Sequence, residues 1–331
     1  MKALLLALTA LSVVALVLGL WVGAGDLSDP RLRETYLTLR AHRVAVAFFT
    51  GSALAVGGVL VQGLFRNPLA SPSVLGTTAG ASLGGQASLL IWDGVLAGTA
   101  PTLLGVALVP DMLVPLGCVA GALGSLVLLL AVTRGRADLV LLLLTGFLLS
   151  AMFLSLGGFL ISIAQDSWEL GRAVIAFTLG GVSGSGARQV ALIATITIGG
   201  VFAAFMWARP LDLLLSGEHE AASLGVDVPA TRRWCVVWTA LLSGGAVAVA
   251  GNVGFVGLVV PHALRLFTGP DHRKLVPACA IGGGAFLVLC DVVARAIPTT
   301  GELPLGVVTG LIGAPLFLAL LLRSRRELIS G

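Results

Sequence analysis

The chain has 331 residues with a formal net charge of +4; 57% of them are hydrophobic, only 11% are charged, and the mean hydropathy is +1.04. A soluble domain carries roughly 25% charged residues, so this composition excludes a soluble enzyme, a nucleic-acid-binding domain and a disordered chain. The apolar residues form long runs instead of alternating, which favours spanning helices over a β-barrel. We therefore predict an all-α, polytopic membrane protein.

Ten apolar segments approach the spanning length of about 20 residues. They fall at about 3–23, 44–64, 73–92, 112–132, 138–163, 189–208, 231–250, 253–268, 274–296 and 304–322. The first segment could be a secretory signal, but its apolar run is longer than a typical signal core, so we interpret it as a span. The eighth is short and contains Pro261. We treat residues 1–331 as a single transmembrane domain.

An even number of spans places both termini on the same side of the membrane. With the termini in the cytoplasm, most of the 20 Lys and Arg residues fall in cytoplasmic loops, as the positive-inside rule requires. We therefore expect a multi-pass protein of the bacterial inner membrane with both termini cytoplasmic. In this orientation Arg31, Arg33, Arg40 and Arg43 cluster on the outer side, before the second span.

An internal repeat is visible in two glycine- and alanine-rich segments. The sequence from Gly51 to Gly58 resembles the one from Gly244 to Gly251, and each continues through a proline-bearing segment into another small-residue span. The second span runs inward and the seventh outward, so the repeat is inverted, as in transporters whose path lies at the repeat interface. We predict repeat halves at roughly 44–163 and 231–322. The alternative is that small-residue helices resemble one another by composition alone.

Two prolines interrupt the chain directly after the second span. Pro68 and Pro72 lie in RNPLASPSVLG, residues 66–76, and break any helix there. Non-helical backbone at membrane depth occurs only inside protein or against water. With Gln62 just upstream, the segment is a candidate constriction on a transport path; the alternative is a tight cytoplasmic loop.

Residues 211–229, LDLLLSGEHEAASLGVDVP, are too polar to span the membrane. We expect Ser216 to cap a short helix, with Glu218 and Glu220 in its first turn and Gly225 at its end. An apolar face would comprise Leu213, Leu214, Ala221 and Leu224. A short cytoplasmic helix suits docking to another protein. The alternative, a helix resting on lipid, is disfavoured because the acidic pair would face an anionic leaflet.

The remaining charged residues suggest two roles. The outer arginines, together with Arg295, could dock a partner's carboxylates; the alternative is solvated charges facing lipid headgroups. Asp291 lies one helical turn before Arg295, which predicts a structural salt bridge. Neither Lys2 nor Lys274 lies in a glycine-rich Gly-Lys-Ser/Thr loop, so any ATPase must be another chain. The scattered His and Cys residues predict no metal site.

At this point the sequence resembles the permeases of FecCD-type, or type II, ABC importers, which take up iron–siderophore complexes, haem and cobalamin. The resemblance covers roughly residues 36–323. It rests on Arg40 and Arg43 followed by Arg66-Asn-Pro-Leu-Ala-Ser-Pro, on GEHEAASLG at 217–225, and on GFVGLVVPH at 254–262 with GELPLG at 301–306.

The resemblance implies a homodimer of ten-helix subunits with the path between the two copies. Two ABC ATPase subunits would bind ATP and Mg beneath, and a periplasmic or lipid-anchored binding protein would deliver substrate from above. This chain would bind no cofactor and no nucleic acid, and would contribute no catalytic residue. Arg40, Arg43 and Arg295 match residues that dock the binding protein, and Asn67 and Leu69 match a cytoplasmic gate. The ATPase-coupling helices of the family match Leu213, Leu214, Ser216, Gly217, Glu218, His219, Glu220, Ala221, Leu224 and Gly225.

We therefore expect the permease subunit of an ATP-driven importer of large metal chelates, working by alternating access. One alternative is a permease for bare Zn²⁺ or Mn²⁺, although such an ion path would need His or Asp in the spans. Another is an ion-coupled secondary transporter, which would usually need more acidic residues within the membrane than this chain has.

Overall fold

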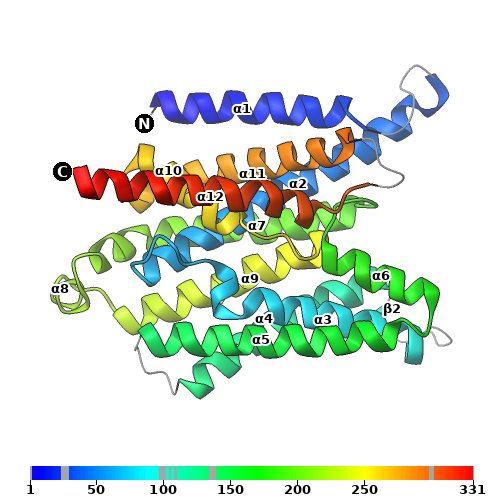
Figure 1. Cartoon of the computed structure of the whole chain (residues 1–331), viewed down its shortest axis with the longest axis horizontal. Helices are drawn as coiled ribbons and strands as arrows, with labels where there is room; N and C mark the ends of the chain where they lie inside the picture. The colour runs from blue at the N-terminus through cyan, green and yellow to red at the C-terminus, as the bar shows by residue number, and fades with distance from the viewer. Residues whose placement is uncertain are drawn as a thin grey trace.

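The structure is a computed structural model that describes residues 2–23, 30–96, 102–103, 106–107, 110–133, 139–297 and 302–330. Within these ranges the chain forms a bundle of twelve α-helices, most of which run along one common axis (Figure 1). In chain order they are α1 (Lys2–Trp21), α2 (Pro30–Leu64), α3 (Thr77–Ile91), α4 (Pro110–Val132), α5 (Leu139–Ala164), α6 (Trp168–Leu179), α7 (Ala187–Leu214), α8 (Glu218–Ser223), α9 (Val228–Ala250), α10 (Val256–Thr268), α11 (His272–Ala296) and α12 (Leu305–Ser330).

Four short elements complete the secondary structure of the described residues. A 3₁₀ turn, η1 (Pro72–Leu75), precedes α3, and a π-helical turn, η2 (Trp92–Leu96), follows it. Two residue pairs, β1 (Thr102–Leu103) and β2 (Val106–Ala107), are antiparallel to each other.

The helices match the ten predicted spans in order. Seven of them, α1, α2, α4, α5, α7, α9 and α11, are long and apolar enough to cross a membrane. The other three predicted spans are α3 with its preceding turn η1, α10, and the apolar part of α12. The prediction of an all-α polytopic membrane protein is confirmed. At 13 residues, α10 is only about 20 Å long, so the non-helical residues before it extend into the bundle.

The structure differs from the prediction at three places. First, α2 begins at Pro30, so the outer arginines lie on a helical extension of the second span instead of a loop. No glycine or proline interrupts the chain between Arg31 and Thr50. Second, residues between the predicted spans 138–163 and 189–208 form an additional helix, α6. Third, α7 continues through Pro210 and takes in the start of the predicted coupling segment.

Helix α2 is the centre of the bundle. Its apolar window is 83% buried, and it packs against α7, α9, α10 and α11. Glycines permit the closest approaches: a Cβ atom on Gly51 would lie 2.2 Å from the carbonyl oxygen of Gly283 in α11. In the same way, a Cβ on Gly84 of α3 would lie 2.0 Å from the carbonyl oxygen of Gly117 in α4. Small residues therefore bring these backbones into direct contact, as lipid-embedded helices require.

The helix contacts come in matching pairs. α3 packs on α4 as α10 packs on α11, and α4 packs on α9 as α11 packs on α2. α3 also contacts α9 as α10 contacts α2. In Figure 1 α2 and α9 run in opposite directions along the bundle. If α2, α3, α4 and α5 are exchanged with α9, α10, α11 and α12 in that order, each of these helix contacts becomes its match.

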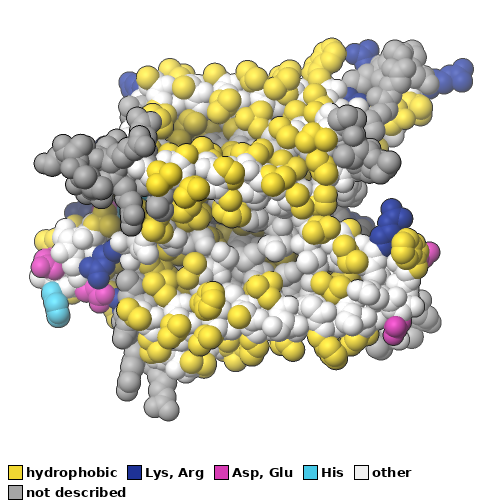
Figure 2. All heavy atoms as spheres, in the orientation of Figure 1, with side chains coloured by type: hydrophobic (Ala, Val, Ile, Leu, Met, Phe, Trp, Pro, Cys, Tyr) yellow, Lys and Arg dark blue, Asp and Glu magenta, His cyan; other side chains and the backbone are white. Residues whose placement is uncertain are grey.

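The charged side chains gather at the two ends of the bundle. Figure 1 shows α8 at the same end as both chain termini, whereas α6 and the first turns of α2 lie at the other end. We call these the α8 end and the α6 end. In Figure 2 Lys, Arg, Asp, Glu and His side chains cluster at these ends, and hydrophobic side chains cover most of the surface between them. This is the distribution expected of a bundle that crosses a membrane along its long axis.

Candidate functional site

At the α8 end, a short helix stands between two long ones. α8 spans only six residues, from Glu218 to Ser223, and turns connect it to α7 and α9. Its first turn carries Glu218 and Glu220, and Gly225 adopts a left-handed conformation (φ +84°) just after its end, both as predicted. The predicted segment 211–229 therefore contains one helix of its own, because residues 211–214 belong to α7 and residues 228–229 to α9.

Two details of the prediction for this segment are wrong. The N-cap position is Gly217, not Ser216, and no side chain caps the helix. The four expected apolar residues do not share one face: Leu214 and Ala221 are buried in the core of this chain, whereas Leu224 is 64% exposed. A helix of fewer than two turns has room for one buried anchor, which is Ala221, so its other side chains face outward. The exposed set is His219, Glu220, Ala222, Ser223 and Leu224.

Glu218 ties α8 to two neighbouring segments. Its carboxylate forms an ion pair and a hydrogen bond with Arg232 in the first turns of α9. It also lies 4.0 Å from the guanidinium of Arg66, which follows the end of α2. Arg66 adopts a left-handed conformation (φ +49°), which costs a non-glycine residue on the order of 1 kcal/mol or more. Sequence patterns did not predict this three-residue link, because Arg66 lies far from Glu218 and Arg232 along the chain.

The predicted gate residues lie in the loop directly after Arg66. The side-chain oxygen of Asn67 accepts a hydrogen bond from the backbone N–H of Leu69 at 2.9 Å, which closes a tight turn. This turn leaves the Leu69 side chain exposed. Just upstream, the buried Gln62 accepts a hydrogen bond from Arg265 of α10 at 3.4 Å. The loop of the predicted gate residues is therefore attached to α8 through Arg66, and the last turns of α2 before it are attached to α10 through Gln62.

Two helix interruptions meet inside the bundle. The first is η1, and the second is the segment 251–255 before α10, where Phe255 adopts a left-handed conformation (φ +67°). A cavity of about 200 Å³ lies between them and is lined by both segments. Its polar lining is neutral: Ser71, Ser73, Thr78 and Asn252. The first interruption contacts α5, since Ser150 donates a hydrogen bond to the Ser73 carbonyl at 3.0 Å.

At the α6 end, four charged side chains form one network. Asp291 of α11 is 1% exposed and lies 2.8 Å from Arg295, so the predicted salt bridge is confirmed. The same carboxylate receives Nε and Nη2 of Arg43 from α2, at 3.0 and 2.8 Å. The remaining nitrogen of Arg43, Nη1, lies 2.8 Å from both carboxylate oxygens of Glu302, in the non-helical segment before α12. We call Arg43, Asp291, Arg295 and Glu302 the outer charge network.

Two arginines at this end bind the last carbonyl groups of α1. Arg40 donates to the carbonyl oxygens of Leu20, Trp21 and Gly23, each at 3.0 Å. Arg295 donates to the Gly19 carbonyl at 3.0 Å and also to that of Val22. A helix leaves its last carbonyls unpaired with a partial negative charge, so two guanidinium groups are well placed there. The structure thus brings Arg40, Arg43 and Arg295 together, but it points their guanidinium groups into the protein.

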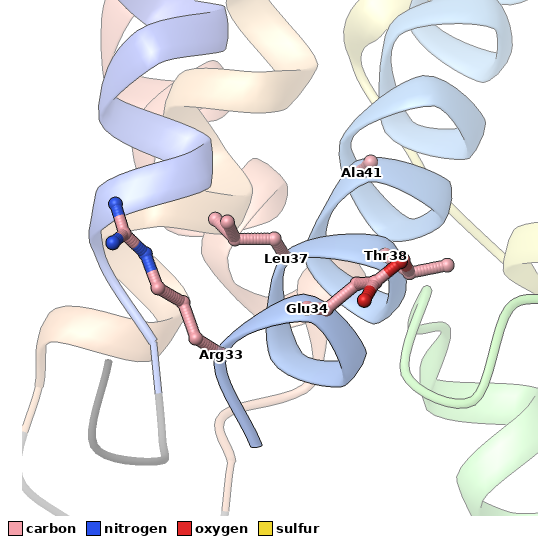
Figure 3. Close-up of a pocket in the computed structure, with 5 residues that line it drawn as sticks. All are labelled: Arg33, Glu34, Leu37, Thr38 and Ala41. Carbon is pink, nitrogen blue, oxygen red and sulfur yellow. The ribbon is translucent and has the colours of Figure 1, made fainter. Parts of the chain in front are cut away.

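Part of the surface at this end lies along the helical extension of α2. Arg33, Glu34, Leu37, Thr38 and Ala41 line a hollow of about 460 Å³ there (Figure 3). Arg33 and Glu34 point to different sides of the helix. A second hollow, of about 260 Å³, is lined by Arg40, Arg43, Arg295 and Glu302. The α6 end therefore presents exposed charges in the first turn of α2 and buried ones further along.

The described residues contain no group of three or more His, Cys, Asp or Glu side chains that could hold a metal ion. All four cysteines are buried as free thiols. The candidate functional features are thus an exposed short helix linked to the loop of Asn67 and Leu69 at one end, a neutral cavity between two broken helices, and an arginine-rich network at the other end.

Comparisons with known proteins agree with this arrangement. Residues 3–323 match the FecCD transport family. The chain is 36% identical over 331 residues to the vitamin B12 import system permease protein BtuC of Escherichia coli, covering 97% of this chain and 95% of that protein. It is 39% identical over 287 residues to the Fe(3+) dicitrate transport system permease protein FecD of Escherichia coli K12, covering 86% of this chain and 84% of that protein.

A solved structure of a metal-chelate type ABC transporter, in an inward-facing conformation, superposes with a TM-score of 0.83 at 29% identity. The superposition covers 97% of this chain and 98% of the other. The family match spans nearly the whole chain and includes the broken helices, the short helix α8 and the outer charge network. The chain belongs to the FecCD transport family.

Proposed function

We propose that this chain is the permease subunit of an ATP-driven importer that carries metal chelates across the inner membrane. ATP and Mg would be bound by two separate ABC ATPase subunits, and this chain would take no catalytic part in hydrolysis. The observation that carries the proposal is α8, a short helix at one end of an apolar bundle, exposed on its outer side and linked by Glu218 to the gate loop.

In this proposal α8 is the part of the chain that binds the ATPase subunits. Its exposed side chains, from His219 to Leu224, would fill a groove on the ATPase, and the buried Ala221 would transmit the force to α7 and α9. The ion pair between Glu218 and Arg232 makes α8 move together with the start of α9. We infer that this end is cytoplasmic, with both termini beside α8.

The gate would respond because Arg66 joins Glu218 to the loop of Asn67 and Leu69. Movement of α8 would shift Arg66 and thereby the exposed Leu69, which lies beside the proposed path. We further infer that residues 44–163 and 231–322 are the two halves of an inverted repeat. The exchange of helix contacts between α2–α5 and α9–α12 supports this inference.

The path itself would lie between two copies of the chain. α5 supports this, because its apolar window is only 22% buried and carries large exposed side chains such as Phe147 and Phe159. Between α5 and α12 the wall is formed by the two helix interruptions and their neutral cavity. A large, rigid cargo would pass such a wall without binding tightly to a charged group.

A binding protein on the outer side would dock at the α6 end, where Arg40, Arg43 and Arg295 lie together. The cargo class follows from the relatives, which are named for vitamin B12 and for ferric dicitrate. Both are metal chelates, and neither a bare Zn²⁺ or Mn²⁺ ion nor an ion-coupled mechanism is supported by these relatives.

The test is uptake into proteoliposomes that contain the chain with the ATPase and binding protein encoded beside it. Radiolabelled cyanocobalamin and ferric dicitrate serve as probes, each with and without ATP inside the vesicles. ATP-dependent accumulation of either chelate is expected. Accumulation driven by a proton or sodium gradient without ATP would refute the proposal.

A variant lacking residues 218–224 separates the role of α8 from that of the rest of the chain. It should insert into the membrane and still form the outer charge network, but lose ATP-dependent uptake and stimulation of the ATPase by the binding protein. Uptake at the wild-type rate would remove the coupling role of α8.

A further inference from the structure

The outer charge network contains one partner that can be exchanged. Asp291 is 1% exposed and is shared by two arginines. Arg295 is itself 3% exposed; its Nε donates to the backbone carbonyl of Asp291 and its Nη1 to the Gly19 carbonyl of α1. By contrast, Glu302 is 44% exposed, and among the described residues its carboxylate is hydrogen-bonded to Arg43 alone. Removing Glu302 would leave Nη1 of Arg43 without a partner, whereas removing Asp291 would disrupt the whole network.

We propose that Glu302 occupies the position of a partner protein's carboxylate on Arg43, and that a docking partner displaces it. The inference rests on the proposed docking of a binding protein at the α6 end and narrows it to one atom, Nη1 of Arg43. Arg40 and Arg295 then act as positioning residues, because their guanidinium groups are occupied by α1 and Asp291.

The geometry supports a carboxylate as the exchanged group. Nη1 of Arg43 is 2.8 Å from each oxygen of Glu302, so the site already holds a carboxylate at hydrogen-bond distance. The hollow of about 260 Å³ beside this pair is lined by Arg40, Arg43, Arg295 and Glu302 and gives an incoming side chain room to enter. Charges balance as well: two arginines and Asp291 leave one positive charge, which Glu302 neutralises now and an acidic partner would neutralise later.

Displacement would have an effect beyond the contact itself. Glu302 lies three residues before the start of α12, and the N–H of Leu305 donates to the carbonyl of Gly180 at 2.9 Å. An incoming carboxylate would release Glu302 from Arg43 and leave the Leu305 hydrogen bond to hold the segment that leads into α12, which we place at the wall of the path. Docking and the position of α12 become linked through one ion pair.

The experiment uses the complete transporter in lipid nanodiscs and the binding protein encoded beside it. Binding affinity is measured for the wild type, for Glu302→Gln and for Glu34→Gln. Glu34 is the matched control, since it is an exposed acid at the same end, near the start of α2 (Figure 3). Both changes remove one negative charge, so a general electrostatic gain would appear in both.

Removing a competing carboxylate should tighten binding by Glu302→Gln about three- to thirty-fold, the range expected for a partly exposed, charge-assisted pair. Glu34→Gln should change the affinity less than two-fold. An unchanged or weaker affinity for Glu302→Gln, or an equal gain in both variants, would overturn the proposal. If the binding protein fails to bind the wild type at all, the docking role of this end is refuted instead.

A second measurement does not depend on the binding protein. Phenylglyoxal labels accessible arginines, and mass spectrometry reports each site separately. Arg43 should react slowly in the wild type and several-fold faster in Glu302→Gln, while Arg295 stays protected and Arg33 reacts rapidly in both. Added binding protein should slow the labelling of Arg43 in the variant. Equal labelling of Arg43 in both proteins would overturn the proposal. So would the finding that phosphatidylglycerol vesicles alone protect Arg43 of the variant as well as the binding protein does, because a lipid phosphate would then be the occupant.

Discussion

Contact between the backbones of α3 and α4 leads to a sharp prediction about a single methyl group. In Gly84→Ala the new Cβ would lie 2.0 Å from the carbonyl oxygen of Gly117, whereas real Cβ contacts almost never fall below 3.0 Å. The two helices must therefore separate by about 1 Å locally, and the atom that is struck belongs to a helix backbone that cannot rotate away. Gly124 of α4 is the matched control, since a Cβ there would meet nothing within 4 Å.

The magnitudes follow from these two environments. Overpacking typically costs about 1–3 kcal/mol, and we take about 3 kcal/mol because backbone is struck. Replacing a helical glycine by alanine stabilises the helix by about 1 kcal/mol. The free energy of unfolding should therefore fall by about 2 kcal/mol in Gly84→Ala and rise by up to about 1 kcal/mol in Gly124→Ala. At about 2–4 °C per kcal/mol, the two melting temperatures should differ by about 6–12 °C.

A thiol-reactive fluorogenic maleimide provides the assay. All four cysteines are buried and free, and Cys118 lies on α4 beside this contact, so the dye reports unfolding without an added label. Thermal ramps of both variants in the same detergent give the comparison. Equal melting temperatures for Gly84→Ala and Gly124→Ala would show that the helices do not touch through these glycines, and the packing argument would be wrong.

Three further predictions concern charged residues. Glu218→Gln should raise hydrogen exchange in residues 215–226 and lower ATP-dependent uptake, whereas Glu220→Gln, on the exposed side of α8, should leave that exchange at the wild-type level. Asp291→Asn should lower the melting temperature by an amount equivalent to about 3–5 kcal/mol, because two buried arginines lose their shared partner; a loss no greater than that of Glu302→Gln would contradict the network. Lys274 and backbone N–H groups lower the pKa of Asp271 at the start of α11, so its stabilising effect should be complete above the ordinary Asp pKa and lost only as the pH falls through the lowered value. Exchange at the first turn of α11 should rise in that acidic range, and Asp271→Ala, which removes the cap, should abolish the pH dependence.

The sequence predicted those features that depend on composition and short spacing. The ten spans, the break before α3, the left-handed Gly225 and the salt bridge between Asp291 and Arg295 all involve residues within one segment or one helical turn. Local chemistry decides each of them: apolar runs of spanning length, proline without a donor, glycine at positive φ, and opposite charges four residues apart.

Other features require knowledge of which segments meet. Arg43 and Glu302 are 259 residues apart, and Glu218 reaches Arg66 only because the end of α2 lies beside α8. No spacing rule connects such pairs. The extension of α2 and the helix α6 were missed for another reason: both carry polar and charged residues of the kind found in connectors, and within α6 only Gly171 and Val174 are buried.

The hydrogen bonds from Arg40 and Arg295 to the end of α1 have a consequence for how the chain assembles. α1 is synthesised before the other described helices, yet one of the two side chains that bind its last carbonyls belongs to α11, which emerges some 270 residues later. Until then α1 keeps its apolar surface exposed to lipid and is free to turn in the membrane. Even in the complete bundle its apolar window is only 22% buried. α1 therefore reaches its final position only after α11 is in place. A truncation before α11 should leave it bound by Arg40 but without the helix on which it mainly packs.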